Sequence, residues 1–252
     1  MSKRIVIKVG TGVLTGDAGE LDARILEDLV DQIVQLRKEG VEVVLVTSGA
    51  VGAGKSVLAK HGTNTPVIEK QLYAAVGQVK LMTMYAELFG KRGYLCAQVL
   101  ATKEDFRDES HYENMKNCLN ALLPDGVVPI VNENDVVATT ELMFTDNDEL
   151  AGLIVSLLRA DLFIILTSSD GILDTDGKTV AEVNPDNAER VAGYITLDTS
   201  AAGRGGMRTK FDIARRLASE GTSVYIAPGK APRTLLDIFE GKPHGTRFAT
   251  VV

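Results

Sequence analysis

Short apolar runs alternate with amphipathic stretches along this chain of 252 residues. The runs at Arg4–Val9 and at residues 41–46 are rich in Val and Ile, which is typical of strands buried on both faces of a parallel sheet. Between them, apolar residues from Ile25 to Leu36 recur at helical spacing after Asp22, a residue type that caps helices. Strand, helix and strand in this order predict an α/β fold with a mainly parallel sheet.

The alternation continues to the end of the chain, and no repeat or linker divides it, so we expect a single domain over residues 1–252. Residues 174–206 are polar and contain glycines, which predicts a hairpin and loops over a site. Ligands of open parallel sheets bind beyond the carboxyl ends of the strands, where the motifs below fall. Further strands are expected at residues 94–100, 127–131, 161–166 and 223–227, and further helices at 67–91, 112–123, 150–158, Met207–Ser219 and 232–240.

Charge and composition exclude several classes of protein. The net charge is −7 and no basic cluster occurs, so we expect no nucleic-acid binding. No apolar run reaches the length of a membrane span, and the opening segment indicates a buried strand rather than a signal peptide. The only cysteines, Cys96 and Cys118, are expected to pack as small core residues in a reducing cytoplasm. Solvated positions are expected for His61, His111 and His244.

Two segments combine a strand end, glycines and a lysine. Lys8 lies inside the first apolar run, where it is costly unless its ammonium reaches water or an anion. An edge strand with a plain turn explains it equally well. Residues 49–56 match the G-x-x-x-x-G-K-[ST] pattern of a P-loop NTPase, with Lys55 as phosphate ligand and Asp170 for Mg²⁺. We favour residues 47–50 as an anion cradle at a helix N-terminus, with Lys55 on the helix surface.

Polar residues follow the strand expected at 127–131. Residues 132–135, Asn-Glu-Asn-Asp, offer donors and acceptors that suit a ligand with both an ammonium and a carboxylate, such as an amino acid. A turn that caps itself is the alternative. In the next segment Asp146 and Glu149 fit a helix cap, which needs no further function. Asn147 and Asp148 are not required by a cap and are functional candidates.

Residues 203–210, Gly-Arg-Gly-Gly-Met-Arg-Thr-Lys, enter a predicted helix. Glycines before a helix start can surround a phosphate with backbone N–H groups, and the basic side chains add charge. Basic residues in a first helical turn oppose the helix dipole, so a bound anion would explain them. A flexible loop with a basic helix start is the alternative. By physical argument alone this segment is the strongest indication of a phosphate site.

Taken together and in order, six stretches resemble the amino-acid kinase family, and within it the members that phosphorylate glutamate. They are IKVGTGVLT, VTSGAV, KQLYAAVGQ, VNENDVV, FTDNDEL and GRGGMRTK. The resemblance implies a three-layer α/β/α sandwich around a mainly parallel open sheet. It also implies that residues 1–160 hold the amino acid and residues 161–252 the nucleotide.

The resemblance implies ATP-dependent phosphorylation of the side-chain carboxylate of L-glutamate to L-glutamyl 5-phosphate, the first step of proline biosynthesis. Lys8 and Lys210 would contact the transferring phosphoryl group, and Asp148 would orient both lysines. The implied glutamate-binding residues are Ser48, Gly49, Asp135 and Asn147. The implied nucleotide-binding residues are Lys8, Thr167, Ser168, Arg204, Gly205, Gly206, Met207, Arg208, Thr209 and Lys210.

The chain departs from the family pattern at Ser168, where Asp is common, and at Arg204, where Thr is common. Mg²⁺ is expected to bridge the nucleotide phosphates, held mainly by phosphates and water, and no protein ligand is assigned to it. Many members continue into a C-terminal PUA domain, for which we expect no room in this chain. The resemblance further implies a homo-oligomer, dimer or tetramer, and competition by proline.

Two other functions stay open at this point. One is a P-loop NTPase that uses Lys55. The other is a non-catalytic amino-acid sensor that kept the fold and lost turnover. The presence of Lys8, Lys210 and Asp148 together argues against the sensor.

Overall fold

The computed structural model describes residues 3–16, 19–58, 65–138, 144, 146–195 and 206–250. The strands of this described part are β1 Arg4–Val9, β2 Glu42–Val46, β3 Cys96–Ala101, β4 Val128–Glu133, β5 Leu162–Thr167, β6 Glu182–Val183, β7 Ser223–Pro228 and β8 Thr246–Phe248. They form one sheet in the order β3-β4-β2-β1-β5-β7-β8-β6. Neighbouring strands are parallel except β7 and β8, which run antiparallel. The prediction of a mainly parallel sheet is confirmed.

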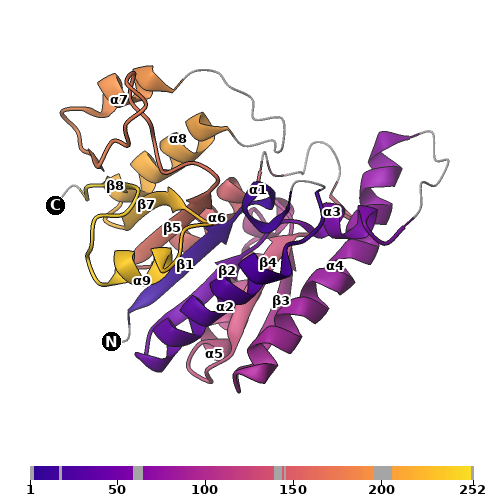
Figure 1. Cartoon of the computed structure of the whole chain (residues 1–252). Coiled ribbons are helices and arrows are strands. Elements are labelled where there is room, and N and C mark those ends of the chain that lie inside the picture. The colour runs from indigo at the N-terminus through magenta and orange to yellow at the C-terminus, as the bar shows by residue number, and fades with distance from the viewer. Residues whose placement is uncertain are drawn as a thin grey trace.

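Helices cover both faces of this sheet (Figure 1). The helices of the described residues are α1 Thr11–Leu14, α2 Ala23–Lys38, α3 Ala50–Lys55, α4 Pro66–Lys91, α5 Glu109–Leu122, α6 Asn147–Leu158, α7 Ala188–Tyr194, α8 Met207–Ser219 and α9 Thr234–Phe239. One apolar core joins the sheet to α1, α2, α3, α4 and α9, and a second joins it to α5, α6, α7 and α8. The molecule is therefore the expected three-layer α/β/α sandwich.

The central position of β1 in the sheet explains the apolar run Ile5-Val6-Ile7. Successive side chains of a strand point to opposite faces, so Ile5 and Ile7 enter the first core and Val6 enters the second. Lys8 belongs to the same face as Val6, the face that α6 covers. The period of the strand thus directs this one lysine towards the N-terminus of α6.

Most element boundaries agree with the sequence pattern. Asp22 caps α2, because its carboxylate accepts from the N–H groups of Arg24 and Ile25 at 2.9 and 3.4 Å. The prediction for β4 was too short, since the strand continues through Asn132 and Glu133, which pair with β3. Polar side chains hid this continuation, because the apolar run ends before the backbone pairing does.

Three smaller predictions need correction. Cys118 is exposed on α5 and Cys96 is only partly buried, so neither is a fully buried core residue. His111 is exposed as expected, whereas His244 is half-buried, and His61 lies outside the described residues. The hairpin predicted in segment 174–206 is present as the antiparallel bridge between Leu173 and Thr179, but the segment also contains the strand β6 and the helix α7, which were not predicted.

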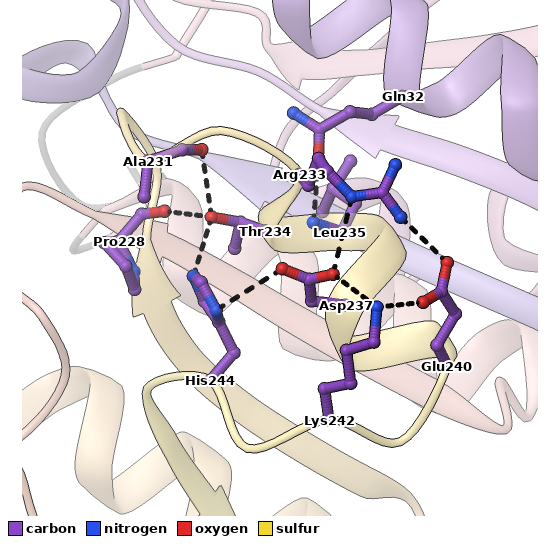
Figure 2. Close-up of polar contacts among 10 residues, drawn as sticks. All are labelled: Gln32, Pro228, Ala231, Arg233, Thr234, Leu235, Asp237, Glu240, Lys242 and His244. Atoms are coloured by element: carbon purple, nitrogen blue, oxygen red, sulfur yellow. Dashed lines mark hydrogen bonds and ion pairs between the residues drawn. The ribbon is translucent and has the colours of Figure 1, made fainter.

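A polar cluster at the start of α9 holds the end of β7 in place (Figure 2). The buried Thr234 hydroxyl donates to the carbonyl oxygen of Pro228 at 2.8 Å, and His244 Nε2 lies 3.1 Å from that hydroxyl. The N–H of Leu235 donates to Gln32 of α2 at 2.9 Å. Pro228 lies opposite Thr167, the last residue of β5, in the sheet register. The cluster therefore fixes the carboxyl ends of β5 and β7.

Candidate active site

A cavity of about 570 Å³ opens at the carboxyl ends of the central strands. Lys8 of β1, Ser48 after β2, Asp135 after β4 and Ser168 after β5 all line it. Parallel strands end at the same edge of a sheet, so four segments far apart in the sequence meet there. The volume is in the range of sites that bind small molecules.

Two lysines contact one buried aspartate at the inner end of this cavity. Lys8 Nζ lies 2.6 Å from Asp148 Oδ1, and Lys210 Nζ lies 2.8 Å from Asp148 Oδ2. The side chain of Asp148 is 0% exposed, and those of Lys8 and Lys210 are 6% and 11% exposed. Burial by itself would raise the pKa of Asp148, but the two ammonium groups hold its pKa below the usual range. One buried carboxylate thus holds two ammonium groups close together, an arrangement that suits an anionic ligand.

Three elements bring these side chains together. Lys8 leaves β1 on the face covered by α6, and Asp148 lies in the first turn of α6. Lys210 lies in the first turn of α8, which packs against α6. Gly152 permits that approach, because a Cβ there would lie 3.0 Å from Ile213 of α8. The close packing of α6 and α8 therefore places Lys210 beside Asp148.

An amide network connects α6 to the ends of β2 and β4. The side-chain amide of Asn147 lies 2.6 Å from the carbonyl oxygen of Thr47, 3.0 Å from Ser48 Oγ and 2.8 Å from Asn132 Oδ1. Asn132 in turn donates to Gln78 of α4 at 2.9 Å. These bonds fix the polar floor of the cavity between the two strand ends.

The outer end of the cavity carries an ion pair between Lys70 of α4 and Asp135. The two side chains are 24% and 12% exposed, and both line the cavity. Beside them, Gln71 donates to the carbonyl oxygen of Val136 at 3.0 Å. The start of α4 is thereby joined to the turn that follows β4.

Asp146 caps α6 at the rim of the charged inner end. Its Oδ1 accepts from the N–H groups of Asp148 and Glu149 at 2.7 and 3.1 Å. Burial, followed by the neighbouring charge of Asp148, raises the pKa of Asp146 above its usual value. Asp146 and Asp148, two residues apart at one helix start, thus have pKa shifts of opposite sign, because Asp148 forms the ion pairs with Lys8 and Lys210.

The local structure does not favour the P-loop interpretation of residues 49–56. Gly49 has φ +99° in the left-handed region and is the N-cap of α3, so the residues that would form the phosphate loop are already helical. Gly54 is required for packing, because a Cβ there would overlap the backbone of Tyr73 on α4. Lys55 is exposed at the rim of the cavity, with its Nζ 5.8 Å from the centre of the Tyr73 ring. The glycine of this motif at position 54 is explained by the packing of α3 against α4.

The predicted nucleotide segment is only partly placed. Lys8, Thr167, Ser168 and Lys210 line the cavity, as do all four predicted glutamate-binding residues. Arg204 and Gly205 lie outside the described residues. The other four predicted residues do not line the cavity: Gly206 caps α8, Met207 packs against the second core, Arg208 pairs with Asp212, and Thr209 continues the helix.

Sequence reasoning missed Lys70. Its stretch was part of the family resemblance, but a lysine in a predicted amphipathic helix gives no signal of its own. Only the packing of α4 beside the end of β4 reveals that it lines the cavity.

Mg²⁺ prefers oxygen ligands, which carboxylate side chains of the cavity could supply. Within the described ranges, no group of three or more His, Cys, Asp or Glu side chains could hold a metal ion. The described carboxylates of the cavity, Glu133, Asp135, Asp146 and Asp148, already contact protein cations or N–H groups. These residues fit a metal ion that arrives on the nucleotide and is held mainly by phosphate and water.

Among the described residues, no helix combines the length and the apolar character that a membrane span requires.

Comparison with known proteins gives consistent results. The sequence profile described as "Amino acid kinase family" matches residues 3–228. The chain is 50% identical over 248 residues to "Glutamate 5-kinase" of Chlorobaculum tepidum, covering 98% of this chain and 69% of the relative. It is 46% identical over 242 residues to "Glutamate 5-kinase" of Bacteroides thetaiotaomicron, covering 94% and 67%.

The fold also matches a solved structure. "Carbamate kinase from Giardia lamblia bound to AMP-PNP" superposes with a TM-score of 0.71, covering 99% of each chain at 16% identity. At that identity the likeness supports the fold alone.

Proposed function

The chain belongs to the amino acid kinase family, and on this premise we propose that it transfers the γ-phosphoryl group of ATP to the side-chain carboxylate of L-glutamate. The product is L-glutamyl 5-phosphate, the first intermediate of proline biosynthesis. The observation that carries the proposal is the buried Lys8–Asp148–Lys210 cluster at the inner end of the cavity.

The chemistry requires positioning rather than proton transfer. A glutamate side-chain carboxylate is already ionised at neutral pH, so no general base is needed to activate it. The obstacle is the approach of one anion to a triphosphate. Lys8 and Lys210 neutralise the charge on the transferring phosphoryl oxygens, and Asp148 holds both ammonium groups in a fixed position before the substrates bind. The low exposure of the cluster strengthens its field.

The same proposal assigns the two sides of the cavity. Glutamate occupies the side lined by Ser48, Gly49, Asp135 and Asn147, contributed by residues 1–160. The nucleotide occupies the side of Thr167, Ser168 and the start of α8, contributed by residues 161–252. Mg²⁺, brought in with the nucleotide, would offset part of the phosphate charge. No protein side chain is assigned to it.

Three further proposals follow from the family resemblance. We place the protein in the cytoplasm, a reducing compartment that suits the unpaired Cys96 and Cys118. We expect it to assemble as a dimer or tetramer. We also expect proline to compete with glutamate, because a cyclic amino acid shares the ammonium and carboxylate that the outer end of the cavity would bind.

The test is an assay of ATP consumption with glutamate, N-acetylglutamate, aspartate and carbamate offered in parallel. We expect turnover with glutamate, and hydroxylamine should trap the acyl phosphate as the γ-hydroxamate. Turnover with N-acetylglutamate and none with glutamate would overturn the assignment. ATP hydrolysis that is independent of any acceptor would instead support a plain NTPase.

A further inference from the structure

The ion pair between Lys70 and Asp135 differs from the surface pairs of the molecule by its place. Lys70 comes from α4 and Asp135 from the turn after β4, and both line the cavity. Lys80, on the same helix, instead donates to Ser56 Oγ at 2.9 Å and does not line the cavity. One lysine of α4 therefore faces the binding space while another supports α3.

We propose that Lys70 is the residue that binds the α-carboxylate of the amino-acid substrate, with Asp135 as the partner of its α-ammonium. The proposal rests on the proposed function, which supplies a free amino acid as substrate. The two side chains neutralise each other in an ion pair. On binding, the zwitterionic end of the substrate lies between them. Lys70 then pairs with the substrate α-carboxylate instead of Asp135, and Asp135 pairs with the α-ammonium instead of Lys70.

Charge balance favours a substrate that carries both an α-ammonium and an α-carboxylate over a ligand that lacks one of these groups. A pair that is 24% and 12% exposed retains contact with water, so it opens at lower cost than a fully buried pair. After opening, neither charge is left without a partner, because the substrate brings one ammonium and one carboxylate. A ligand with only one of these groups would leave a protein charge unmatched, which is costly in a partly desolvated site.

The strand order gives the distance that this arrangement needs. Asp135 follows β4, and Lys8 is the penultimate residue of β1, with β2 between the two strands. Strands lie about 4.8 Å apart, so the two positions are separated by roughly 10 Å across the sheet. Glutamate with a phosphoryl group beyond its side-chain carboxylate extends over a similar distance. The α-carbon therefore reaches the Lys70–Asp135 pair when the side chain reaches the inner lysines.

The inference explains selection of a free amino acid. An N-acylated glutamate lacks the α-ammonium, so Asp135 would lose its partner. A glutamate analogue without the α-carboxylate, such as 4-aminobutyrate, would leave Lys70 without one. Lys70 thus adds a specificity-determining residue on α4 to those that follow the strands.

The experiment measures glutamate KM, ATP KM and kcat for Lys70→Met, Lys70→Arg and the matched control Lys80→Met. We expect Lys70→Met to raise the glutamate KM roughly ten- to hundredfold, the effect of losing a charged hydrogen bond. The ATP KM and kcat should change much less. Lys70→Arg should restore most of the affinity, and Lys80→Met should leave the glutamate KM near the wild-type value.

A second measurement separates binding from a purely structural role. The inhibition constant of 4-aminobutyrate against glutamate should not rise in Lys70→Met and should fall, because this ligand has no α-carboxylate for Lys70 and the variant has no ion pair with Asp135 to open. An equal loss of affinity for both ligands would overturn the inference and make Lys70 a tether of the turn. So would an unchanged glutamate KM in Lys70→Met. If Lys70→Met does not fold, Lys70→Gln replaces it, since its amide can still reach Asp135.

The two proposals fail in different ways. Wild-type enzyme that consumes no ATP with glutamate contradicts the proposed function. Wild-type enzyme that is active, with glutamate kinetics insensitive to Lys70, contradicts only the present inference.

Discussion

The two ends of the cavity use charge in different ways. At the inner end, Lys8 and Lys210 share the buried Asp148, so two ammonium groups are held close together and largely out of water. At the outer end, Lys70 and Asp135 form a neutral pair that is still in contact with solvent. Two cations held close together suit a transferring phosphoryl group, whereas a neutral pair that can open suits a zwitterion. On the proposed function, we expect the inner end to govern the rate and the outer end to govern the affinity for glutamate.

The largest effect should come from Lys8→Ala. It removes one of two cations from the inner end, and such a loss costs roughly 3–4 kcal/mol of transition-state stabilisation, or a hundredfold to a thousandfold in kcat. Steady-state kinetics at saturating glutamate and ATP measure it. The melting temperature should be compared in parallel, because Asp148 is left with a single partner.

Lys55→Ala is the matched control for that substitution. Lys55 also follows a glycine-rich strand end but is exposed, so its removal should change kcat less than about twofold. An inactive Lys55→Ala beside a nearly normal Lys8→Ala would reverse the comparison and restore the P-loop hypothesis.

A smaller effect, confined to affinity, is expected for Asp135→Ala at the outer end. The variant should raise the glutamate KM roughly ten- to a hundredfold through the lost charged hydrogen bond, and the ATP KM should stay nearly constant. Initial rates over a grid of both substrates provide the measurement. If kcat falls while the glutamate KM stays the same, the two ends do not divide rate and affinity as proposed.

The smallest effect concerns the pH dependence of stability at the inner end. The pKa of Asp146 is raised in the folded protein, so its carboxylate costs stability at pH 7, and protonation relieves that cost as the pH falls through the folded pKa. Asp146→Asn keeps the capping oxygen and should increase the free energy of unfolding at pH 7. This gain should vanish on acidification towards pH 4.

Asp148 should show the opposite sign. Its folded pKa is lowered, so its contribution is complete above the unfolded value of 3.8 and is lost as the pH falls through the folded pKa. Asp148→Asn should therefore be less stable than wild type at pH 7, and the deficit should shrink only below pH 3.8. Urea unfolding at several pH values measures both variants. A constant difference for Asp146→Asn between pH 7 and 4 would show that its carboxylate is not strained.

The sequence determined the layers of the fold. Continuous Val and Ile runs predicted β1, β2 and β5, and helical spacing with the cap at Asp22 predicted α2. These signals are local, because burial on two faces or on one face dictates the residue types of each element. The segments that contain Lys8, Asp148 and Lys210 were also predicted from the sequence, because a lysine in an apolar run, a carboxylate that a helix cap does not need and basic residues in a first helical turn each call for a partner.

Only the tertiary structure decided which of these groups meet. The order of strands places Asp135 away from Lys8, and the contact between α6 and α8 places Lys210 on Asp148. The packing of Gly54 against α4 argues against the P-loop hypothesis, which the sequence pattern alone had supported. The same helix contributes Lys70, which no local sequence pattern had indicated. Residue periodicity encodes how each element is buried, but the contacts between elements depend on the packing of the whole sheet and its two helical layers.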